Sequence, residues 1–386
     1  MSSPLRDARL SRGWSSTRLR HELTLAARRL NVPIATDASL RVLISRWENG
    51  HASPDPVNRL LLLEVLHLDA AALGFEEPVD SSHSDVAGLL TQAIRRNQPP
   101  VAVVNYFARQ LADHVMLDNL AGPAHLLDTV IGQLRQVELL AECGATDVAE
   151  VASRYAEFCG WLHQDVGRNG EALRLTSRSV DFAEMAGNLE LATYNRMRKA
   201  NLLAVAGELQ LAASVAGRAL DDASRHFPHL VPVCLRQHAL TSARLKDEHG
   251  ARASIERALA LTAESVDGSG LATYCTTGYV QMEAALCLLV LRLPAEAANV
   301  CAEALSTWPS TLVRDRTVCH ARHAIALLEL REFEEACRTA MLALDGVRSA
   351  PSGRVLQQLR LVVNRLHPVG RNAYVRELTE ALAEVV

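Results

Sequence analysis

Small and apolar positions recur at regular intervals from about residue 146 onward. The pattern Ala-x6-Ala-Leu, or a close variant, begins at residues 172, 212, 251, 297 and 336, so successive copies are 40, 39, 46 and 39 residues apart. Because only small side chains allow two antiparallel helices to approach closely, this spacing predicts five helix hairpins. Twelve residues before each copy stands another small residue, in order Gly160, Ala200, Ala239, Ala285 and Ala324.

The composition favours helices along the whole chain. Hydrophobic residues make up 49% of the sequence but aromatic residues only 4%. The commonest residues, Ala, Leu, Arg and Glu, are strong helix formers, and runs of β-branched residues at period two are almost absent. The sequence therefore predicts an all-α fold.

The five hairpins resemble tetratricopeptide (TPR) repeats with a period longer than the usual 34 residues. Each hairpin of this kind buries its apolar face only against its neighbours, so the hairpins stack into an α-solenoid with a concave groove. We assign residues 146–386 to this TPR-like repeat domain. Its last two helices, within 353–386 and separated at His367-Pro368, are expected to cap the array.

In such arrays the first helix of each hairpin lines the groove. Aromatic, amide and charged side chains at these positions are suited to contact a peptide or small-molecule ligand. The alternative is that they line a solvated groove or pack against a neighbouring domain. The candidates are Arg154, Glu157, Trp161, Tyr194, Asn201, Arg236 and Tyr279.

The first 75 residues show a different pattern of short helices. Helices are predicted over residues 4–12, 15–30, 37–47 and 56–66, and a short fifth ends near residues 73–75. Gly13 and Asn49-Gly50 end the first and third helices, and Ser15 or Ser16 is expected to cap the second. Asp37 or Ser39 is expected to cap the third.

Residues 4–75 resemble the XRE-type (phage-repressor-like) helix-turn-helix family of DNA-binding regulators, most closely its actinobacterial members. The resemblance rests on the run Leu5-Arg6-Asp7-Ala8-Arg9 with Gly13, on Leu43-Ile44-Ser45-Arg46-Trp47-Glu48-Asn49-Gly50, and on Pro54 before a Leu-rich helix. It implies a five-helix DNA-binding domain. It also implies a partly buried ion pair between Arg9 and Glu48 that ties the first helix to the third.

The third helix carries the expected DNA contacts. Helical spacing places Arg41, Val42, Ser45 and Arg46 on one side, opposite a core side with Leu40, Ile44 and Trp47. Arginine can pair with guanine in the major groove, and valine can touch a thymine methyl group. By the resemblance, Arg41, Val42 and Arg46 read bases and Asn49 contacts the DNA backbone. Ser39, near the start of the helix, and Ser45 complete the candidates.

Charge is distributed unevenly. Residues 1–50 contain nine Arg and four acidic residues, a net charge of +5, whereas the remainder has 31 basic and 40 acidic residues, a net charge of −9. A basic segment on an acidic body favours a polyanionic partner, although fifty residues can also be basic by chance.

The intervening residues divide into a polar linker over 76–84 and a helical connector, or degenerate repeats, over 85–145. Glu76-Glu77-Pro78 and three serines mark the linker. Within the connector, helices are expected over 85–96, 101–119 and 124–142, with a break at Pro99-Pro100.

No catalytic or cofactor motif is found. The sequence lacks phosphate-binding loops, a nucleophile elbow and the zinc-protease and kinase signatures. His320 and His323 have no obvious third metal ligand, and the eight Cys fall mostly in apolar helical runs. There is no secretory or membrane-spanning pattern. We therefore expect a cytoplasmic protein that is not an enzyme and needs no cofactor or metal.

Two functions fit these observations. The first is a sequence-specific transcriptional regulator that acts as a homodimer on palindromic double-stranded operator DNA and senses a peptide, small molecule or protein through its repeats. The second is a TPR scaffold for protein interactions whose helical head does not bind DNA.

Overall fold

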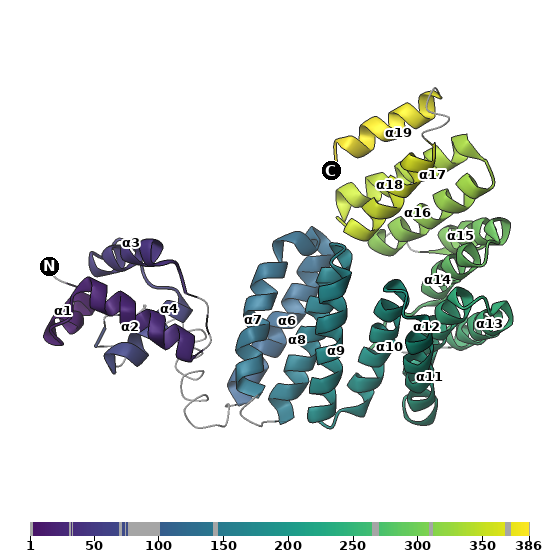
Figure 1. Cartoon of the computed structure of the whole chain (residues 1–386). Coiled ribbons are helices and arrows are strands. Elements are labelled where there is room, and N and C mark those ends of the chain that lie inside the picture. Colours follow the sequence, from purple (N-terminus) through teal and green to yellow (C-terminus); the bar gives the residue numbers. More distant parts are fainter. Residues whose placement is uncertain are drawn as a thin grey trace. The chain divides into compact units, whose positions relative to one another are not determined.

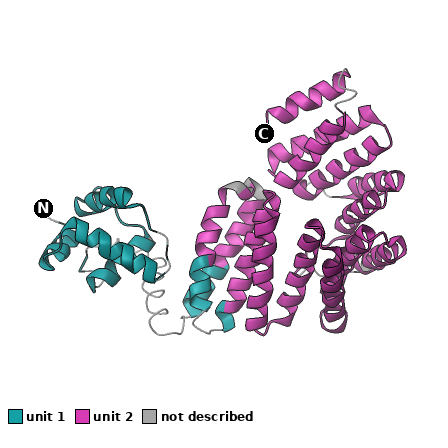
Figure 2. Ribbon diagram, viewed as in Figure 1, with its two compact units in different colours: residues 1–108, 135–148 teal, residues 109–134, 149–386 magenta. Residues whose placement is uncertain are grey.

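The computed structural model describes residues 3–30, 32, 34–68, 72–73, 75, 101–141, 146–264, 270–308, 312–366 and 372–385. Across these residues it contains eighteen α-helices, two short 3-10 helices and no β-strand (Figure 1), which confirms the all-α fold. The chain divides into two compact units (Figure 2). Unit 1 comprises Met1–Ala108 and Arg135–Val148, and unit 2 comprises Arg109–Leu134 and Ala149–Val386.

Unit 1 contains four helices of the predicted DNA-binding domain. They are α1 (Pro4–Ser11), α2 (Ser16–Arg29), α3 (Asp37–Glu48) and α4 (Pro56–Leu66). The predicted fifth helix falls largely outside the described residues, and Ala72 and Leu73 form a turn.

Side chains satisfy the first backbone N–H groups of these helices. Ser15 caps α2 as predicted. Neither Asp37 nor Ser39 caps α3, because Asp37 already has a helical conformation. The extended residue before it, Thr36, accepts the hydrogen bond from the Ser39 N–H instead.

The core of this domain is built from one face of each helix. Leu40, Ile44 and Trp47 of α3 are buried on the predicted side. Their partners come from α1, α2 and α4 and include Leu5, Leu19, Leu23, Leu61, Leu62 and Leu66.

The connector helices α6 (Val101–Ala121) and α7 (Leu127–Ala141) lie close to the predicted ranges, with a 3-10 turn at Pro123–His125 before α7. The predicted linker over 76–84 and the helix over 85–96 lie outside the described residues, so the domain boundaries there stay predictions.

The repeat domain consists of the five predicted hairpins, and the TPR-like solenoid architecture is confirmed. A 3-10 turn at Pro228–Leu230 lies between the second and third hairpins. The hairpins are α8 (Thr146–Asp165) with α9 (Asn169–Met185), α10 (Leu189–Val205) with α11 (Leu209–His226), α12 (Val231–Arg244) with α13 (Glu248–Glu264), α14 (Thr277–Val290) with α15 (Pro294–Thr307), and α16 (Val313–Glu329) with α17 (Phe333–Ser349).

The small residues lie where the helices of each hairpin cross. Ala200, Ala239, Ala285 and Ala324 on the first helices are fully buried. Gly160 shows why size is limited here: a Cβ at this position would lie 2.4 Å from Thr176 Oγ1 on α9. A larger side chain would force the two helices apart.

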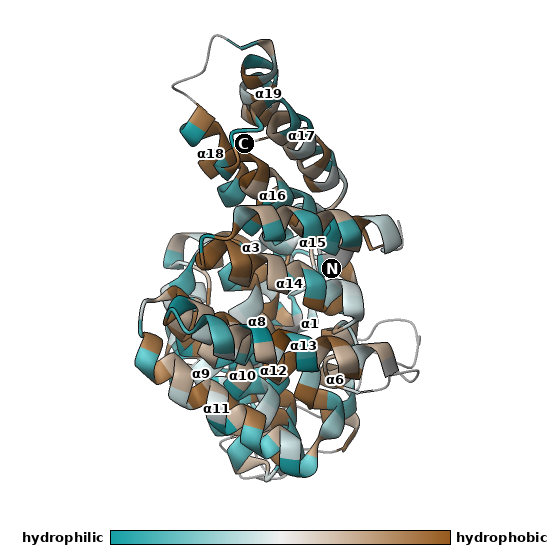
Figure 3. Ribbon diagram, turned by 90° about the vertical axis from the view of Figure 1, so that its right-hand side faces the viewer, coloured by the Kyte–Doolittle hydropathy of each residue, from teal (hydrophilic) through white to brown (hydrophobic). Residues whose placement is uncertain are grey.

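Figure 3 shows hydrophobic and hydrophilic residues on the same helices of the repeats. Second helices such as α11 and α17 have one buried apolar side, whereas α12 is buried almost all round, polar residues included. Six of the seven described cysteines are buried and Cys275 is half-buried. Among the described residues, no helix is both long and apolar enough to cross a membrane. No group of three or more potential metal ligands occurs in this part of the chain either.

Two further helices follow α17, as the break at His367-Pro368 predicts. They are α18 (Gly353–Leu366) and α19 (Ala373–Ala383); α18 packs onto α16 and α17, α19 packs onto α17 and α18, and all four share one apolar core. The start of α18 also lies against the end of α8. A Cβ on Gly353 would approach the Asp165 carbonyl oxygen to 2.3 Å. The last part of the described array thus meets the first hairpin.

Candidate functional site

The outer face of α3 is the first candidate surface. Arg41, Val42, Ser45, Arg46 and Asn49 are all exposed, and Val42 is exposed to 58% although it is apolar. Within the described residues, neither the Arg41 nor the Arg46 guanidinium has a hydrogen bond or an ion pair, so both are available to an external anion. Ser39 is also exposed, at the start of the same helix.

A buried ion pair holds α3 in place. Arg9 Nε lies 2.5 Å from Glu48 Oε1, and Arg9 Nη2 donates to Glu48 Oε2 at 2.9 Å. The hydrogen bond to Glu48 raises the pKa of Arg9. Arg9 Nη1 also donates to the Trp14 carbonyl oxygen. The resemblance implied this pair, and in the structure it connects α1 to the last residue of α3.

The end of α3 is shaped by Gly50. This residue has φ of +71°, in the left-handed region that glycine adopts without strain. Asn49 turns its side-chain amide back onto the Ser45 carbonyl oxygen, at 2.6 Å. The Asn49 side chain therefore caps its own helix in this state.

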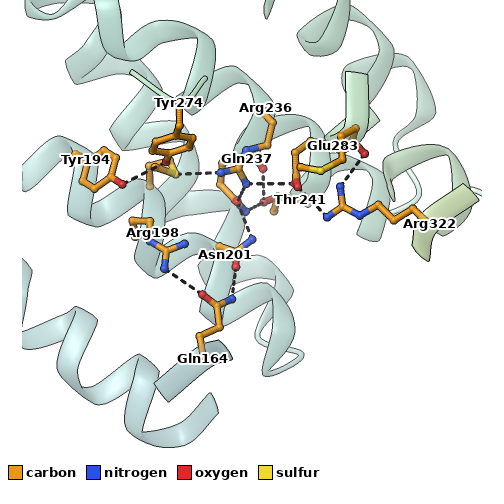
Figure 4. A network of polar contacts seen from close by, with 12 residues as sticks. Gln164, Tyr194, Arg198, Asn201, Arg236, Gln237, Thr241, Tyr274, Glu283 and Arg322 are labelled. Atoms are coloured by element: carbon orange, nitrogen blue, oxygen red, sulfur yellow. Dashed lines mark hydrogen bonds and ion pairs between the residues drawn. The ribbon is translucent and has the colours of Figure 1, made fainter. Parts of the chain in front are cut away.

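A second candidate surface is a polar network contributed mainly by the first helices of the hairpins (Figure 4). Side-chain amides connect three of these helices. Gln164 of α8 donates to Asn201 of α10 at 2.9 Å, and Asn201 donates to Gln237 of α12 at 3.2 Å. Gln237 Oε1 also accepts from Arg236 at 2.8 Å.

Charged residues extend this polar network at both ends. Arg198 of α10 donates to Glu157 of α8 at 2.9 Å, and Arg322 of α16 donates to Glu283 of α14 at 2.8 Å. Arg236 Nη1 is 3.7 Å from Glu283. Burial raises the pKa of Glu283, but the charges of Arg322 and Arg236 outweigh this effect and hold the pKa below its ordinary value.

Three tyrosines lie beside the network. The hydroxyl groups of Tyr194 and Tyr274 are 3.2 Å apart, and the rings of Tyr274 and Tyr279 meet edge-to-face with centroids 5.0 Å apart. The Arg236 guanidinium lies 5.6 Å from the centre of the Tyr279 ring. Burial raises the pKa of all three tyrosines, so they act as neutral groups.

Trp161 of α8 is surrounded by three guanidinium groups. Those of Arg354, Arg198 and Arg314 lie 4.3, 5.1 and 5.4 Å from the centre of its ring. The indole N–H donates to Asp118 of α6 at 3.1 Å, and Arg314 Nη1 donates to the same carboxylate at 2.6 Å. We call Trp161, Asp118, Asp165 and these three arginines the Trp161 cluster.

Asp165 joins the first hairpin to the last helices. Its carboxylate is completely buried and accepts hydrogen bonds from Ser352 at 2.9 Å, Arg354 at 3.0 Å and Arg314 at 3.2 Å. The donors are 149 to 189 residues away along the chain.

The structure brings six of the seven predicted groove residues into this region. Glu157, Trp161, Tyr194, Asn201, Arg236 and Tyr279 belong to the polar network, the tyrosine group or the Trp161 cluster. Arg154 has no contact with these groups: it is exposed and pairs with Glu150 of the same helix. Its assignment to the groove stays a prediction.

The sequence analysis did not predict several residues of the polar network and of the Trp161 cluster. Gln164, Arg198 and Gln237 lie on the same first helices, and a search for polar residues at buried helical positions could have found them. No sequence signal pairs Asp118 or Asp165 with residues of α16 and α18. That pairing depends on how the repeats curve.

Comparisons with known proteins give structural likeness only. No known family and no curated protein matches the sequence. A putative kinesin light chain with TPR-like repeats from Podosopora anserina is 15% identical, covering 52% of this chain and 97% of its own, with a TM-score of 0.34. A Rap protein complexed with competence and sporulation factor is 11% identical, covering 95% and 98%, with a TM-score of 0.42.

A signal-transduction ATPase with a tetratricopeptide repeat sensor from Pyrococcus horikoshii is 13% identical over 91% of this chain, with a TM-score of 0.43. The present chain spans about half of that protein's length, 53%. All three similarities have low identity and TM-scores below 0.5, so they assign neither an activity nor a partner to this chain.

Proposed function

We propose that this chain is a helical-repeat protein that binds a peptide, protein or small-molecule partner through its repeats, and that its N-terminal domain binds double-stranded DNA. Together these activities would make it a cytoplasmic transcriptional regulator. The observation that carries the DNA-binding part is the outer face of α3, where Arg41 and Arg46 are exposed beside the apolar Val42 and have no ion pair with any described residue.

This face has the chemistry that base recognition needs. A helix that enters the major groove presents side chains that can donate to guanine and touch a thymine methyl group. The buried side of α3 and the Arg9–Glu48 pair supply the rigid support. Because one such domain makes few base contacts, we expect two copies of the chain to bind a palindromic site as a homodimer.

The partner-binding part rests on the repeat domain. Its first helices bring aromatic, amide and charged groups of five hairpins together, as the polar network and the Trp161 cluster show. A partner that binds these groups would change the freedom or spacing of two DNA-binding domains, and with them the DNA affinity.

The second candidate function is a protein-interaction scaffold with a head that does not bind DNA. The repeat architecture supports it independently of α3, because such arrays present extended surfaces to other proteins. The acidic remainder of the chain, with a net charge of −9, makes the repeats themselves poor ligands for nucleic acid.

Genome-wide mapping of binding sites with the full chain, followed by gel shifts on the recovered sequence, tests the proposal. Arg46→Ala should weaken specific binding by about 1–3 kcal/mol and relax the preference at one position. Arg257→Ala, which removes an exposed arginine from α13, is the matched control and should bind normally.

The salt dependence separates the two functions. Binding through phosphates weakens steeply as salt rises, because counterions are released. No preference over random DNA, together with normal folding of the head, would exclude DNA recognition and leave the scaffold as the function.

A further inference from the structure

One junction between hairpins is longer than the others. The small-residue pattern recurs at steps of 40, 39, 46 and 39 residues, and the step of 46 spans the junction between α13 and α14. Helix α13 ends at Glu264 and α14 begins only at Thr277, whereas α10 begins at Leu189, soon after α9 ends at Met185. We call residues 270–276, the part of this long junction that directly precedes α14, the strap.

The apolar end of the strap contacts hairpins that come much earlier in the chain. Leu271 packs against a small cluster of buried residues at the end of α9 and the start of α10, namely Ala183, Leu191 and Ala192. A repeat in a solenoid normally contacts only its neighbours. The strap joins the third hairpin to the fourth, yet it contacts the first and the second. The extra length of this junction therefore makes a contact that the period of the repeats does not provide.

The other end of the strap meets residues that the sequence predicted for the ligand groove. The Tyr274 hydroxyl lies 3.2 Å from the hydroxyl of Tyr194 on α10, 80 residues earlier (Figure 4). The Tyr274 ring meets Tyr279 edge-to-face, and the Arg236 guanidinium lies 5.6 Å from the centre of the Tyr279 ring. Three of the predicted groove residues are thus connected to the strap through Tyr274.

The strap is attached by few interactions. Within the described residues, the Tyr194–Tyr274 pair is the one hydrogen bond between the strap and the first two hairpins. Leu271 and Tyr274 are only half-buried. Ala272 has φ of +65°, in the left-handed region that costs a non-glycine residue free energy. A strained segment with few contacts can detach without unfolding the elements around it.

We propose that the strap is an autoinhibitory segment: it occupies the partner-binding face of the repeats, and a partner binds there by displacing it. This inference rests on the proposed binding of a partner by the repeats and adds how that binding is regulated. The strap also indicates the chemistry of the partner. It is a peptide segment with an aliphatic residue and, three positions later, a tyrosine, as Leu271 and Tyr274 are spaced.

Attachment to the same chain gives the strap an advantage over a free peptide. A segment of the same chain competes at an effective concentration on the order of millimolar. The affinity for a partner is reduced by the fraction of chains in which the strap is docked. Releasing the strap should therefore raise the affinity for a partner without adding any contact.

The test uses a displayed library of random peptides, selected on the full chain with Leu271→Ser and Tyr274→Ser, which we call the released variant. We expect the enriched peptides to share an aliphatic residue three positions before a tyrosine. Synthetic copies should bind the released variant at least about tenfold more tightly than the unchanged chain, as measured by calorimetry. Tyr274→Phe keeps the ring but loses the hydroxyl, so it should give a smaller increase of about threefold.

Hydrogen exchange and further variants locate the site. Residues 183–194 should exchange faster in the released variant than in the unchanged chain, and bound peptide should slow their exchange again. Adding Tyr194→Ala to the released variant should weaken peptide binding by about tenfold. Leu342→Ser, which changes an exposed leucine of α17, is the matched control and should behave like the unchanged chain. Melting temperatures show whether each variant is folded, and Tyr274→Phe decides the matter if the released variant unfolds.

Peptides that bind the unchanged chain and both strap variants with equal affinity would overturn autoinhibition while supporting partner binding by the repeats. A bound peptide that leaves the exchange of residues 183–194 unchanged would also overturn the inference, because its site would lie elsewhere. If no peptide is enriched on the released variant, the proposed binding of peptides fails and the inference fails with it. DNA binding, measured in parallel on the same preparation, shows independently whether the N-terminal domain functions.

Discussion

The outer face of α3 and the Trp161 cluster are both rich in arginine, but the arginines are in opposite situations. Arg41 and Arg46 are exposed and have no partner in the described chain. Arg314 is largely buried and bonded to two carboxylates that come from distant helices. The comparison teaches that the partners of an arginine indicate its role. The exposed guanidinium groups of α3 can bind a ligand, whereas Arg314 primarily stabilises the fold.

The largest effect is expected at Asp165. Asp165→Ala would leave Arg314, Arg354 and Ser352 without their shared acceptor in a buried place, so the unfolding free energy of the repeat domain should fall by about 3–5 kcal/mol. Chemical denaturation of the full chain measures this loss of unfolding free energy. Asp345→Ala removes an exposed carboxylate of α17 and should cost less than about 1 kcal/mol. Equal effects of the two variants would show that the cluster is not structural.

Removal of the buried carboxylate of the N-terminal domain, Glu48, should lower the unfolding free energy somewhat less than removal of Asp165. Glu48→Ala leaves Arg9 buried without its carboxylate, although Arg9 still donates to the Trp14 carbonyl oxygen. We expect a loss of about 3 kcal/mol, measured by thermal unfolding of the head. Glu22→Ala, which breaks a pair between the half-buried Glu22 and the exposed Arg18, provides the reference. A loss no larger than that of the reference would mean that α3 is held by its apolar face alone.

A substitution at a helix crossing tests the repeat packing. Ala304 on α15 is fully buried, whereas Ala302 on the same helix is exposed. Ala304→Leu should destabilise the repeats by about 1–3 kcal/mol through overpacking, and Ala302→Leu should change stability by less than about 0.5 kcal/mol. The denaturant concentrations at the midpoint of unfolding compare the two variants. If both leucines were tolerated, the small residues would not be setting the distance between helices.

The pH dependence of the repeat domain's stability should come partly from His320. Burial, together with Arg316 and His323, lowers its pKa to about 4 from an ordinary value of 6.5. Because the unfolded chain takes up this proton first, stability should decrease as pH falls from 6.5 toward 4. His320→Gln should flatten this part of the profile. The exposed His249→Gln variant serves as the control, and an unchanged slope in His320→Gln would argue against a neutral, half-buried histidine at this position.

The smallest effect on stability is expected on α3. Arg41→Ala and Arg46→Ala should each change the unfolding free energy by less than about 0.5 kcal/mol, because their side chains are exposed and form no hydrogen bond or ion pair within the described chain. Calorimetry checks this, and the gel shift reports the same variants' affinity for DNA. A marked loss of stability would place these arginines with the structural group and remove the basis for DNA contact.

The sequence alone determined the helices and their pairing. Its period placed small residues at the crossings, as the complete burial of Ala200, Ala239 and Ala285 shows. The apolar stripe of α3 likewise predicted which face is buried, because helical periodicity is a local property that neighbouring residues encode.

Only the tertiary structure decided how distant side chains meet. Asp118 and Arg314 are 196 residues apart, and Asp165 and Arg354 are 189 apart. Small rotations between successive hairpins add up along a solenoid, and their sum decides whether its last helices reach its first. No single repeat encodes that sum, so the Trp161 cluster could not be predicted from the period of the sequence.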